Sequence, residues 1–299
     1  MKNIYEQVDA NKTSSGIVIA SFIIFISLAT YLISYALGFD ASAVGIAMII
    51  SGFVSFLSFY YSDQIILTIS GAKEANKKEH FHFFTVTENL SRVAKIPMPR
   101  LYVLDDTAMN AFAAGRDPDH AIVCATTGLL ARLSRTELEG VVAHELTHIR
   151  FYDTRLMSIV TILVGLITLL SDILLRTRIR GRSDKGEGNL GILLFVAGLI
   201  MAILSPLIAR LIQLAISRRR EFLADAGGAE LTKYPEGLAL ALEKINTDRE
   251  PLEAANKATA HLYITNPLKN HHDSIGWFAN LFNTHPPVTE RIKALRGSE

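Results

Sequence analysis

The chain has 299 residues, a length that suits one large domain or two smaller ones, and 49% of its residues are hydrophobic. Such a composition makes membrane segments the first structure to look for. The 30 Lys and Arg residues are balanced by 29 Asp and Glu residues, so no overall basic field attracts nucleic acid, and we expect no nucleic-acid partner. The single cysteine, Cys124, excludes an intramolecular disulfide, and its apolar sequence neighbours predict a buried strand residue.

Two apolar stretches near the N-terminus are long enough to cross a membrane. Residues 16–37 and 42–61 are uncharged except at their edges, and about 20 helical residues span a hydrocarbon core of about 30 Å. The first stretch is too long for the apolar region of a signal peptide and lacks a clear cleavage site, so we expect it to stay attached. Residues 1–61 are therefore predicted to form a pair of transmembrane helices.

A second apolar pair, residues 156–175 and 190–209, makes the topology harder to predict. Lys and Arg are frequent in residues 62–155 and absent between the first two spans, which places this segment and both termini in the cytoplasm. The turn of the second pair carries five basic residues between Arg176 and Lys185, so a crossing hairpin opposes the same tendency. We predict that the hairpin crosses; a hairpin that dips partly into the bilayer or packs on the protein stays open.

The polar parts of the chain predict an α+β catalytic domain built from two subdomains, residues 62–155 and 218–299, on either side of a membrane hairpin at 156–217. Ser134 and Glu137 form a capping-box pattern that opens a helix running through His148. Short β-type runs between turn residues predict a small sheet, with strands at residues 101–104, 110–114 and 121–125. Helical patterns lie at residues 63–78, 86–94, 218–246 and 288–295.

The sequence His144-Glu145-Leu146-Thr147-His148 lies on this capped helix. Histidines four residues apart share one helix face, so both can direct a ring nitrogen at one zinc ion, with Glu145 beside them as general base. The motif arises by accident in a chain of this composition with odds on the order of one per cent. Two surface histidines are the alternative interpretation, but apolar Leu146 and the upstream cap favour an ordered, half-buried helix.

Catalytic zinc usually takes a third protein ligand and leaves a fourth position for water. Glu221 and Asp225, at helical i, i+4 spacing, are candidates: Glu221 as a metal ligand, and Asp225 as acceptor of a hydrogen bond from a ligand histidine. An ordinary solvated charged face is the alternative. The apolar hairpin favours the metal site, because it leaves and returns to the same membrane face. A rival metal site at His261, His271 and His272 is less expected, since adjacent histidines in polar loops are usually exposed.

The motifs together resemble the HtpX-type membrane metalloproteases, which are kin to the CAAX prenyl proteases within the gluzincin group. The resemblance spans nearly the whole chain. It rests on the paired N-terminal spans, Asn110-Ala111-Phe112-Ala113-Ala114-Gly115, Gly128-Leu129-Leu130, His144 to His148 with Asp153, Glu221-Phe222-x-Ala-Asp225, and Thr284-His285-Pro286-Pro287 ahead of Glu290-Arg291-Ile292.

This resemblance implies a multi-span α-helical membrane protein with a zincin-like catalytic domain that contains a small sheet and the zinc-binding helix. It implies Glu221 as the third zinc ligand. It also implies that an edge strand of small residues holds the substrate: Asn110, Ala111, Phe112, Ala113 and Ala114. Such a strand can pair with the backbone of an extended peptide and adds little side-chain selectivity. His285 and Arg291 are candidates for stabilising the oxyanion.

The expected function is that of an integral-membrane, zinc-dependent endopeptidase of broad specificity. The resemblance implies a multi-pass protein of the cell membrane with unfolded or damaged membrane proteins as substrates, and the distribution of Lys and Arg predicts that its catalytic domain lies on the cytoplasmic side. A non-catalytic scaffold or transporter with a structural zinc is the alternative. Structural zinc sites are closed by four protein ligands, and the chain offers three. A transporter would carry ionisable groups within its spans, and the first two spans have none.

Overall fold

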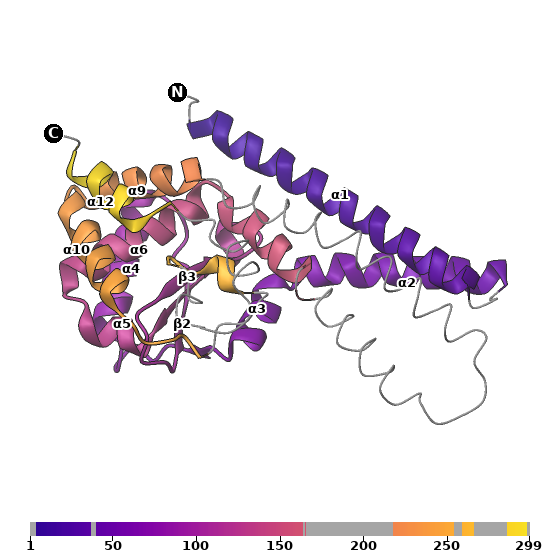
Figure 1. Cartoon of the computed structure of the whole chain (residues 1–299), viewed down its shortest axis with the longest axis horizontal. Helices are drawn as coiled ribbons and strands as arrows, with labels where there is room; N and C mark the ends of the chain where they lie inside the picture. Colours follow the sequence, from indigo (N-terminus) through magenta and orange to yellow (C-terminus); the bar gives the residue numbers. More distant parts are fainter. Residues whose placement is uncertain are drawn as a thin grey trace.

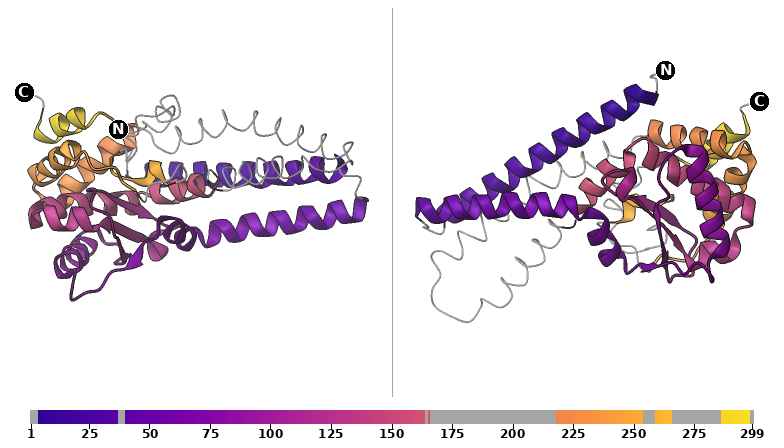
Figure 2. Two further views of the ribbon diagram at one scale, coloured as in Figure 1. Left: turned by 60° about the horizontal axis from the view of Figure 1, so that its bottom comes forward. Right: turned by 180° about the vertical axis from the view of Figure 1, so that it is seen from behind.

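Two long helices project from a compact body in the computed structural model, which describes residues 4–36, 40–163, 165, 218–253, 259–265 and 286–297. Helix α1 (Ile4–Ala36) begins beside the body, and α2 (Ala41–Tyr60) returns to it, so the two helices meet at their far ends (Figure 1). Further views keep both helices outside the body (Figure 2). The chain therefore enters and leaves this helix pair at the same end.

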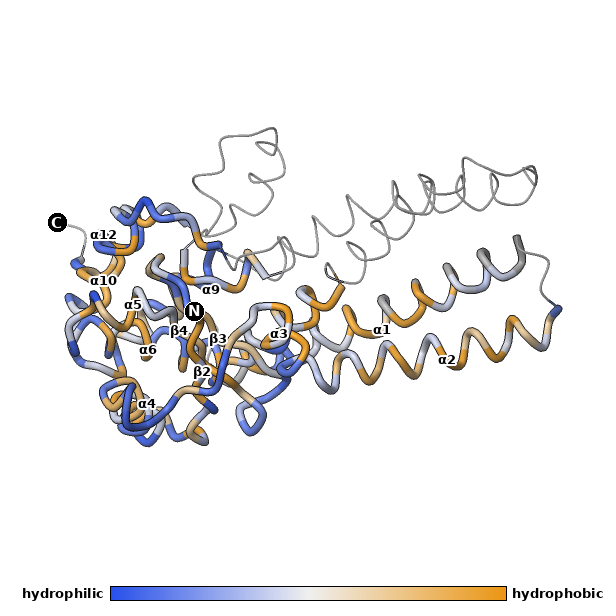
Figure 3. The backbone as a smooth tube through the Cα atoms, turned by 90° about the horizontal axis from the view of Figure 1, so that it is seen from below, coloured by the Kyte–Doolittle hydropathy of each residue, from blue (hydrophilic) through white to orange (hydrophobic). Residues whose placement is uncertain are grey.

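Both helices are long and apolar enough to cross a membrane, over Val8–Leu28 and Ala41–Tyr60. Figure 3 shows that much of both helices consists of hydrophobic residues. Large apolar side chains of both are exposed, among them Ile24, Leu28, Ile46, Ile49 and Phe53. The predicted pair of spans thus corresponds to α1 and α2. The hairpin predicted at 156–217 falls largely outside the described residues; its first residues, 156–163, are helical.

A four-stranded mixed sheet forms the centre of the body, in the order β1-β2-β4-β3. Its strands are β1 (Lys73–Glu74), β2 (Arg100–Leu104), β3 (Ala111–Ala114) and β4 (Ile122–Thr126). Strands β2 and β4 are parallel, whereas β1 and β3 are antiparallel to their neighbours. The three predicted strands are confirmed, and β3 lies at an edge, as expected for Asn110–Ala114.

Strand β1 was not predicted, because its residues were assigned to the helix expected at 63–78. That helix ends before them. Helix α3 (Ser62–Ser70) stops where Gly71 adopts a left-handed backbone with φ of +69°. The chain then turns into β1. Helix α4 (Phe81–Ala94) follows, and it starts earlier than the predicted helix at 86–94.

The two faces of the sheet pack into separate apolar clusters, as the two-residue period of a strand requires. Val103 and Val123 face α4 and helix α6 (Arg135–Arg150). Phe112 and Cys124 face α3 and Tyr263 on the other side, and the Phe112 and Tyr263 rings meet edge to face. Cys124 is therefore the buried strand residue that was expected, and burial raises the pKa of its thiol.

The capping box of α6 is confirmed: Ser134 N donates to Glu137 Oε2 at 2.7 Å, and Glu137 N donates to Ser134 Oγ at 3.4 Å. The helix is buried almost all round rather than half-buried, because helices from the C-terminal region cover its outer side. These are α9 (Arg218–Thr232) and α10 (Pro235–Thr247), and α12 (Val288–Arg296) packs against both of them. The single helix expected at 218–246 is broken before Pro235, which lacks an N–H and cannot continue a helix.

The remaining short elements are α5 (Thr127–Arg132) and the 3-10 turns η1 (Pro118–His120) and η2 (Ala260–Leu262).

Replacement of Gly140 tests the close packing of α6 on α10. A Cβ at Gly140 would lie 2.5 Å from Leu238 N and 2.7 Å from Leu238 Cα, both backbone atoms. We expect Gly140→Ala to cost about 3 kcal/mol of stability, at the upper end for overpacking, measured by thermal unfolding in detergent. Gly52→Ala on α2 is the control, since nothing lies within 4 Å of that position. Equal losses in the two variants would contradict this packing.

The capping box also predicts a pH-dependent stability. Burial raises the pKa of Glu137, but the Lys244 ammonium at 2.7 Å and the Ser134 N–H outweigh it and lower the pKa. A lowered pKa stabilises the fold above the unfolded-state pKa of about 4.3, and this contribution disappears as the pH falls through the folded-state value.

Glu137→Gln is therefore expected to cost about 1 kcal/mol at pH 7. The difference from the unmodified chain should shrink towards zero below pH 4, because the protonated Glu137 then resembles glutamine. Thermal unfolding at pH 7, near pH 4 and at lower pH measures this trend, because the loss occurs as the pH falls through the lowered folded-state pKa. A constant difference across that range would exclude the electrostatic explanation.

Candidate metal centre

Three buried side chains from two helices converge on one point: His144 and His148 from α6, and Glu221 from α9. The two Nε2 atoms lie 3.1 Å apart. Glu221 Oε2 lies 3.8 Å from His144 Nε2, and Glu221 Oε1 lies 3.6 Å from His148 Nε2. The structure thus brings together the three residues that were predicted as zinc ligands.

These residues fit a zinc ion by their chemistry and their spacing. Two imidazole nitrogens and a carboxylate form a ligand set of catalytic zinc sites. At Zn–N distances of about 2.0–2.1 Å, tetrahedral ligand atoms lie about 3.3 Å apart, close to the measured separations of 3.1, 3.6 and 3.8 Å. Small side-chain adjustments would complete the coordination.

Helix α9 approaches α6 closely because small residues line the crossing. A Cβ at Gly228 would lie 3.1 Å from His144 N and 3.3 Å from His144 Cα, so a larger residue here would push the helices apart. Glu221 lies two turns before Gly228 on the same helix. Sequence reasoning did not use the run of small residues after Asp225, which was the available signal for this crossing.

A carboxylate holds each ligand histidine through the ring nitrogen that faces away from the centre. His144 Nδ1 lies 2.9 Å from Asp225 Oδ1, and His148 Nδ1 lies 3.1 Å from Asp153 Oδ2. Such hydrogen bonds select the tautomer whose Nε2 is free for the metal. Asp225 lies where it was expected. Sequence reasoning assigned no such role to Asp153, although it follows His148 by only five residues.

Arg291 is fully buried and makes a two-pronged contact with Asp225, with Nε donating to Oδ2 at 2.9 Å and Nη2 to Oδ1 at 2.7 Å. Its Nη1 donates to the Ile264 carbonyl at 3.0 Å. Burial raises the pKa of Asp225, but the Arg291 charge outweighs it and lowers the pKa to about 2. The oxyanion role of Arg291 stays a prediction, and His285 lies outside the described residues.

The pKa values of the two histidines move in opposite directions. Burial lowers the pKa of His144 to about 4. Burial acts in the same direction on His148, but the hydrogen bond to Asp153 and the negative charge of Glu221 outweigh it and raise the pKa to about 9. A proton on His148 therefore competes with a cation for the same position.

Glu145 is buried beside the two histidines, and burial raises the pKa of its carboxyl to about 7. The backbone of Ala113 on β3 acts on the same carboxyl and opposes part of this shift. A pKa near neutrality suits a group that must both accept and return a proton. The predicted substrate strand therefore runs directly beside the predicted general base.

Of the histidines considered for a rival metal site, His261 is described and lies elsewhere. It is buried, with Nε2 3.1 Å from Thr161 Oγ1 and 3.3 Å from the Met157 carbonyl. His271 and His272 lie outside the described residues. Among the described residues, the grouping of metal-binding side chains is His144, His148 and Glu221.

Replacement of Arg291 tests how much the stability of the metal centre depends on the buried guanidinium of this residue. Arg291→Met leaves Asp225 and Glu221 without their buried cationic neighbour, so we expect a loss of about 3–5 kcal/mol of stability, measured by thermal unfolding, with reduced metal content. Arg296→Met on the same helix is the control. Its ion pairs with Glu236 and Glu243 lie at the surface, and such pairs contribute about 1 kcal/mol or less. Similar losses in both variants would contradict the role of Arg291.

Comparisons with known proteins agree with this geometry. The model of peptidase family M48 matches residues 77–299. A "Protease HtpX homolog" of Dictyoglomus thermophilum is 46% identical over 297 residues, covering 98% of this chain and 94% of the relative. Another, from Thermoanaerobacter pseudethanolicus, is 40% identical over 300 residues, covering 99% and 98%. The crystal structure of S. mikatae Ste24p matches with a TM-score of 0.49 and 17% identity, over 98% of this chain and 67% of that one, a likeness too weak to bear on function.

Proposed function

The chain belongs to peptidase family M48 and is a metallopeptidase, and on this premise we propose that it is an integral-membrane, zinc-dependent endopeptidase. One observation carries the proposal. The Nε2 atoms of His144 and His148 and the Glu221 carboxylate meet at 3.1–3.8 Å, with the Glu145 carboxyl beside them.

His144, His148 and Glu221 would hold one zinc ion, which supplies Lewis-acid chemistry by lowering the pKa of a water molecule and polarising a peptide carbonyl. Glu145 accepts the proton of the attacking water and returns it to the leaving amine. Asp225 and Asp153 keep the two imidazole rings in the required tautomer. The three protein ligands leave a position for water, which favours an enzyme over a scaffold or transporter with a structural zinc.

An extended substrate would pair with the outer edge of β3, in the segment Asn110, Ala111, Phe112, Ala113 and Ala114. The alternation of an antiparallel strand directs the backbone groups of Ala111 and Ala113 away from β4, because Asn110 O accepts from Thr126 N. Ala111 O already accepts from Ile264 N at 3.0 Å, so the substrate would pair at the Ala113 end of the strand. Main-chain pairing of this kind gives affinity with little side-chain selectivity. Broad specificity is therefore proposed.

The oxyanion would be stabilised by His285 rather than by Arg291. This preference is supported by the contacts of the Arg291 guanidinium, whose shortest hydrogen bonds go to Asp225 and Ile264, while His144 at 3.4 Å and Glu221 at 3.7 Å lie farther away.

We place the protein in the cell membrane as a multi-pass protein, with its catalytic domain on the cytoplasmic side. The exposed apolar surfaces of α1 and α2 support insertion, and the basic residues of segment 62–155 support the orientation. Unfolded or damaged membrane proteins are the proposed substrates, since the metal centre lies in the body, next to the end where α1 and α2 join it and therefore close to the proposed bilayer. The 156–217 hairpin is proposed to cross the bilayer.

Metal content and casein cleavage of the purified chain test the zinc site and its base separately. Glu145→Gln is expected to keep about one zinc per chain and to lose about 10²–10⁴-fold in cleavage rate, the usual contribution of a general base. Glu221→Gln should lose both the zinc and the cleavage. Glu139→Gln on the same helix is the control, because that side chain pairs with Arg135 at the surface. Undiminished cleavage by Glu145→Gln would refute the assigned base.

A further inference from the structure

A polar side chain of the first membrane helix contacts the metal centre through one intermediate residue. Asn11 on α1 is 6% exposed. Its Nδ2 group donates to the Phe151 carbonyl at 2.8 Å and to Asp153 Oδ1 at 2.8 Å. Both donors of the carboxamide are therefore used in contacts with residues about 140 positions later in the sequence.

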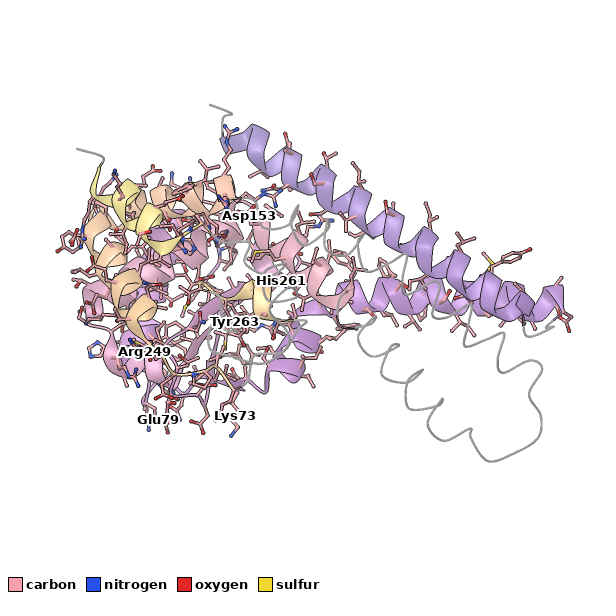
Figure 4. The ribbon with its side chains drawn as sticks, viewed as in Figure 1. Lys73, Glu79, Asp153, Arg249, His261 and Tyr263 are labelled. Atoms are coloured by element: carbon pink, nitrogen blue, oxygen red, sulfur yellow. The ribbon has the colours of Figure 1, made fainter. Side chains whose placement is uncertain are left out.

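Asp153 links Asn11 to the zinc ligand His148. Its other oxygen, Oδ2, lies 3.1 Å from His148 Nδ1, and the residue is 2% exposed. Figure 4 labels Asp153 at the side of the body that α1 approaches. The contacts form a continuous path from α1 through Asp153 to the ring whose Nε2 faces the metal centre.

Helix α1 contacts the turn that carries Asp153 through a second residue. Lys12 places its ammonium 4.4 Å from the ring centroid of Tyr152, and Tyr152 has a positive φ of 61°, a conformation that costs a non-glycine residue energy. The Tyr152 backbone N–H donates to Ile149 O at 3.1 Å. Several contacts thus fix the backbone conformation at the end of α6, and the Lys12 contact from α1 is one of them.

The chemistry of the position calls for asparagine. A buried carboxylate that already serves a histidine needs a further donor for its second oxygen. The neutral carboxamide supplies one hydrogen to Asp153 and one to the Phe151 carbonyl. Aspartate at position 11 would face Asp153 with like charge, and alanine would leave buried acceptors on both Asp153 and Phe151 with fewer donors. Arg220 Nε, 3.5 Å from Asp153 Oδ1, is a cationic neighbour of the same oxygen.

We propose that Asn11 is a positioning residue for the zinc ligand His148, acting through Asp153, so that the first membrane helix supports the metal site. The inference rests on the proposed zinc site. It predicts that loss of the Asn11 carboxamide loosens the Asp153 carboxylate, and with it the orientation of His148. Outer-shell partners of this kind typically contribute about 10–100-fold to metal affinity or activity.

The test measures zinc release from the full-length, zinc-loaded protein in detergent to a chromogenic chelator. Asn11→Ala and Asn11→Asp should release zinc at least about tenfold faster than the unmodified chain. Ser15→Ala is the matched control. It lies one turn further along α1, is fully buried, and its hydroxyl donates to the Asn11 carbonyl without contacting Asp153. Its release rate should match the unmodified chain.

A double-mutant cycle with Asp153→Ala separates positioning from general support of the fold. If Asn11 acts through Asp153, Asn11→Ala should add little to the release rate once Asp153 is alanine. Unchanged release in Asn11→Ala, an equal effect of Ser15→Ala, or additive effects in the cycle would each overturn the proposal. Failure of the zinc assignment itself looks different: the unmodified chain would then lack stoichiometric zinc, and Glu221→Gln would change nothing.

Discussion

The structure depends on burying a cluster of ionisable side chains where helices α6 and α9 cross. Isolated charges inside a protein are strongly unfavourable, so each must be matched by an opposite charge or by hydrogen bonds. Four carboxylates lie in this cluster: Glu145, Asp153, Glu221 and Asp225. Arg291 contacts Asp225, and Arg220 approaches Asp153. With neutral histidines and an ionised Glu145, these six groups leave two negative charges, which is the charge that a divalent cation balances. The proton-binding tendency of His148 reflects the same imbalance.

This charge balance explains why distant parts of the chain must assemble before the site exists. The motif helix contributes two of the proposed ligands, α9 contributes the third together with Asp225, and α12 contributes Arg291. The turn after α6 contributes Asp153, which α1 supports through Asn11. None of the charged segments neutralises its own buried charges, because the opposite charges lie on the other segments. The apolar clusters on the two sheet faces hold these segments in register.

Local chemistry was predictable from sequence, and non-local packing was not. The spacing of His144 and His148, the Ser134 cap and the strand containing Cys124 each follow from a period or a capping rule, and all three appear in the structure. The helix predicted through residue 78 was wrong because one left-handed glycine, Gly71, ends it. Asn11 escaped notice because it precedes the apolar stretch of α1, and no local pattern shows that its partner lies beyond residue 150.

The first turns of α1 determine how far the metal centre lies from a bilayer. The helix has 33 residues, which at about 1.5 Å each makes a rod about 50 Å long, longer than the hydrocarbon core of about 30 Å. If the bilayer begins at Gly16, which lies within the apolar segment Val8–Leu28 and is the first residue of the predicted apolar stretch 16–37, Asn11 lies five residues outside it, or about 8 Å along the axis. In the proposed membrane placement, the metal centre, which Asn11 contacts through Asp153, therefore lies close to the lipid surface. An extended polypeptide leaving the bilayer, advancing about 3.3 Å per residue, covers that height with its first few residues.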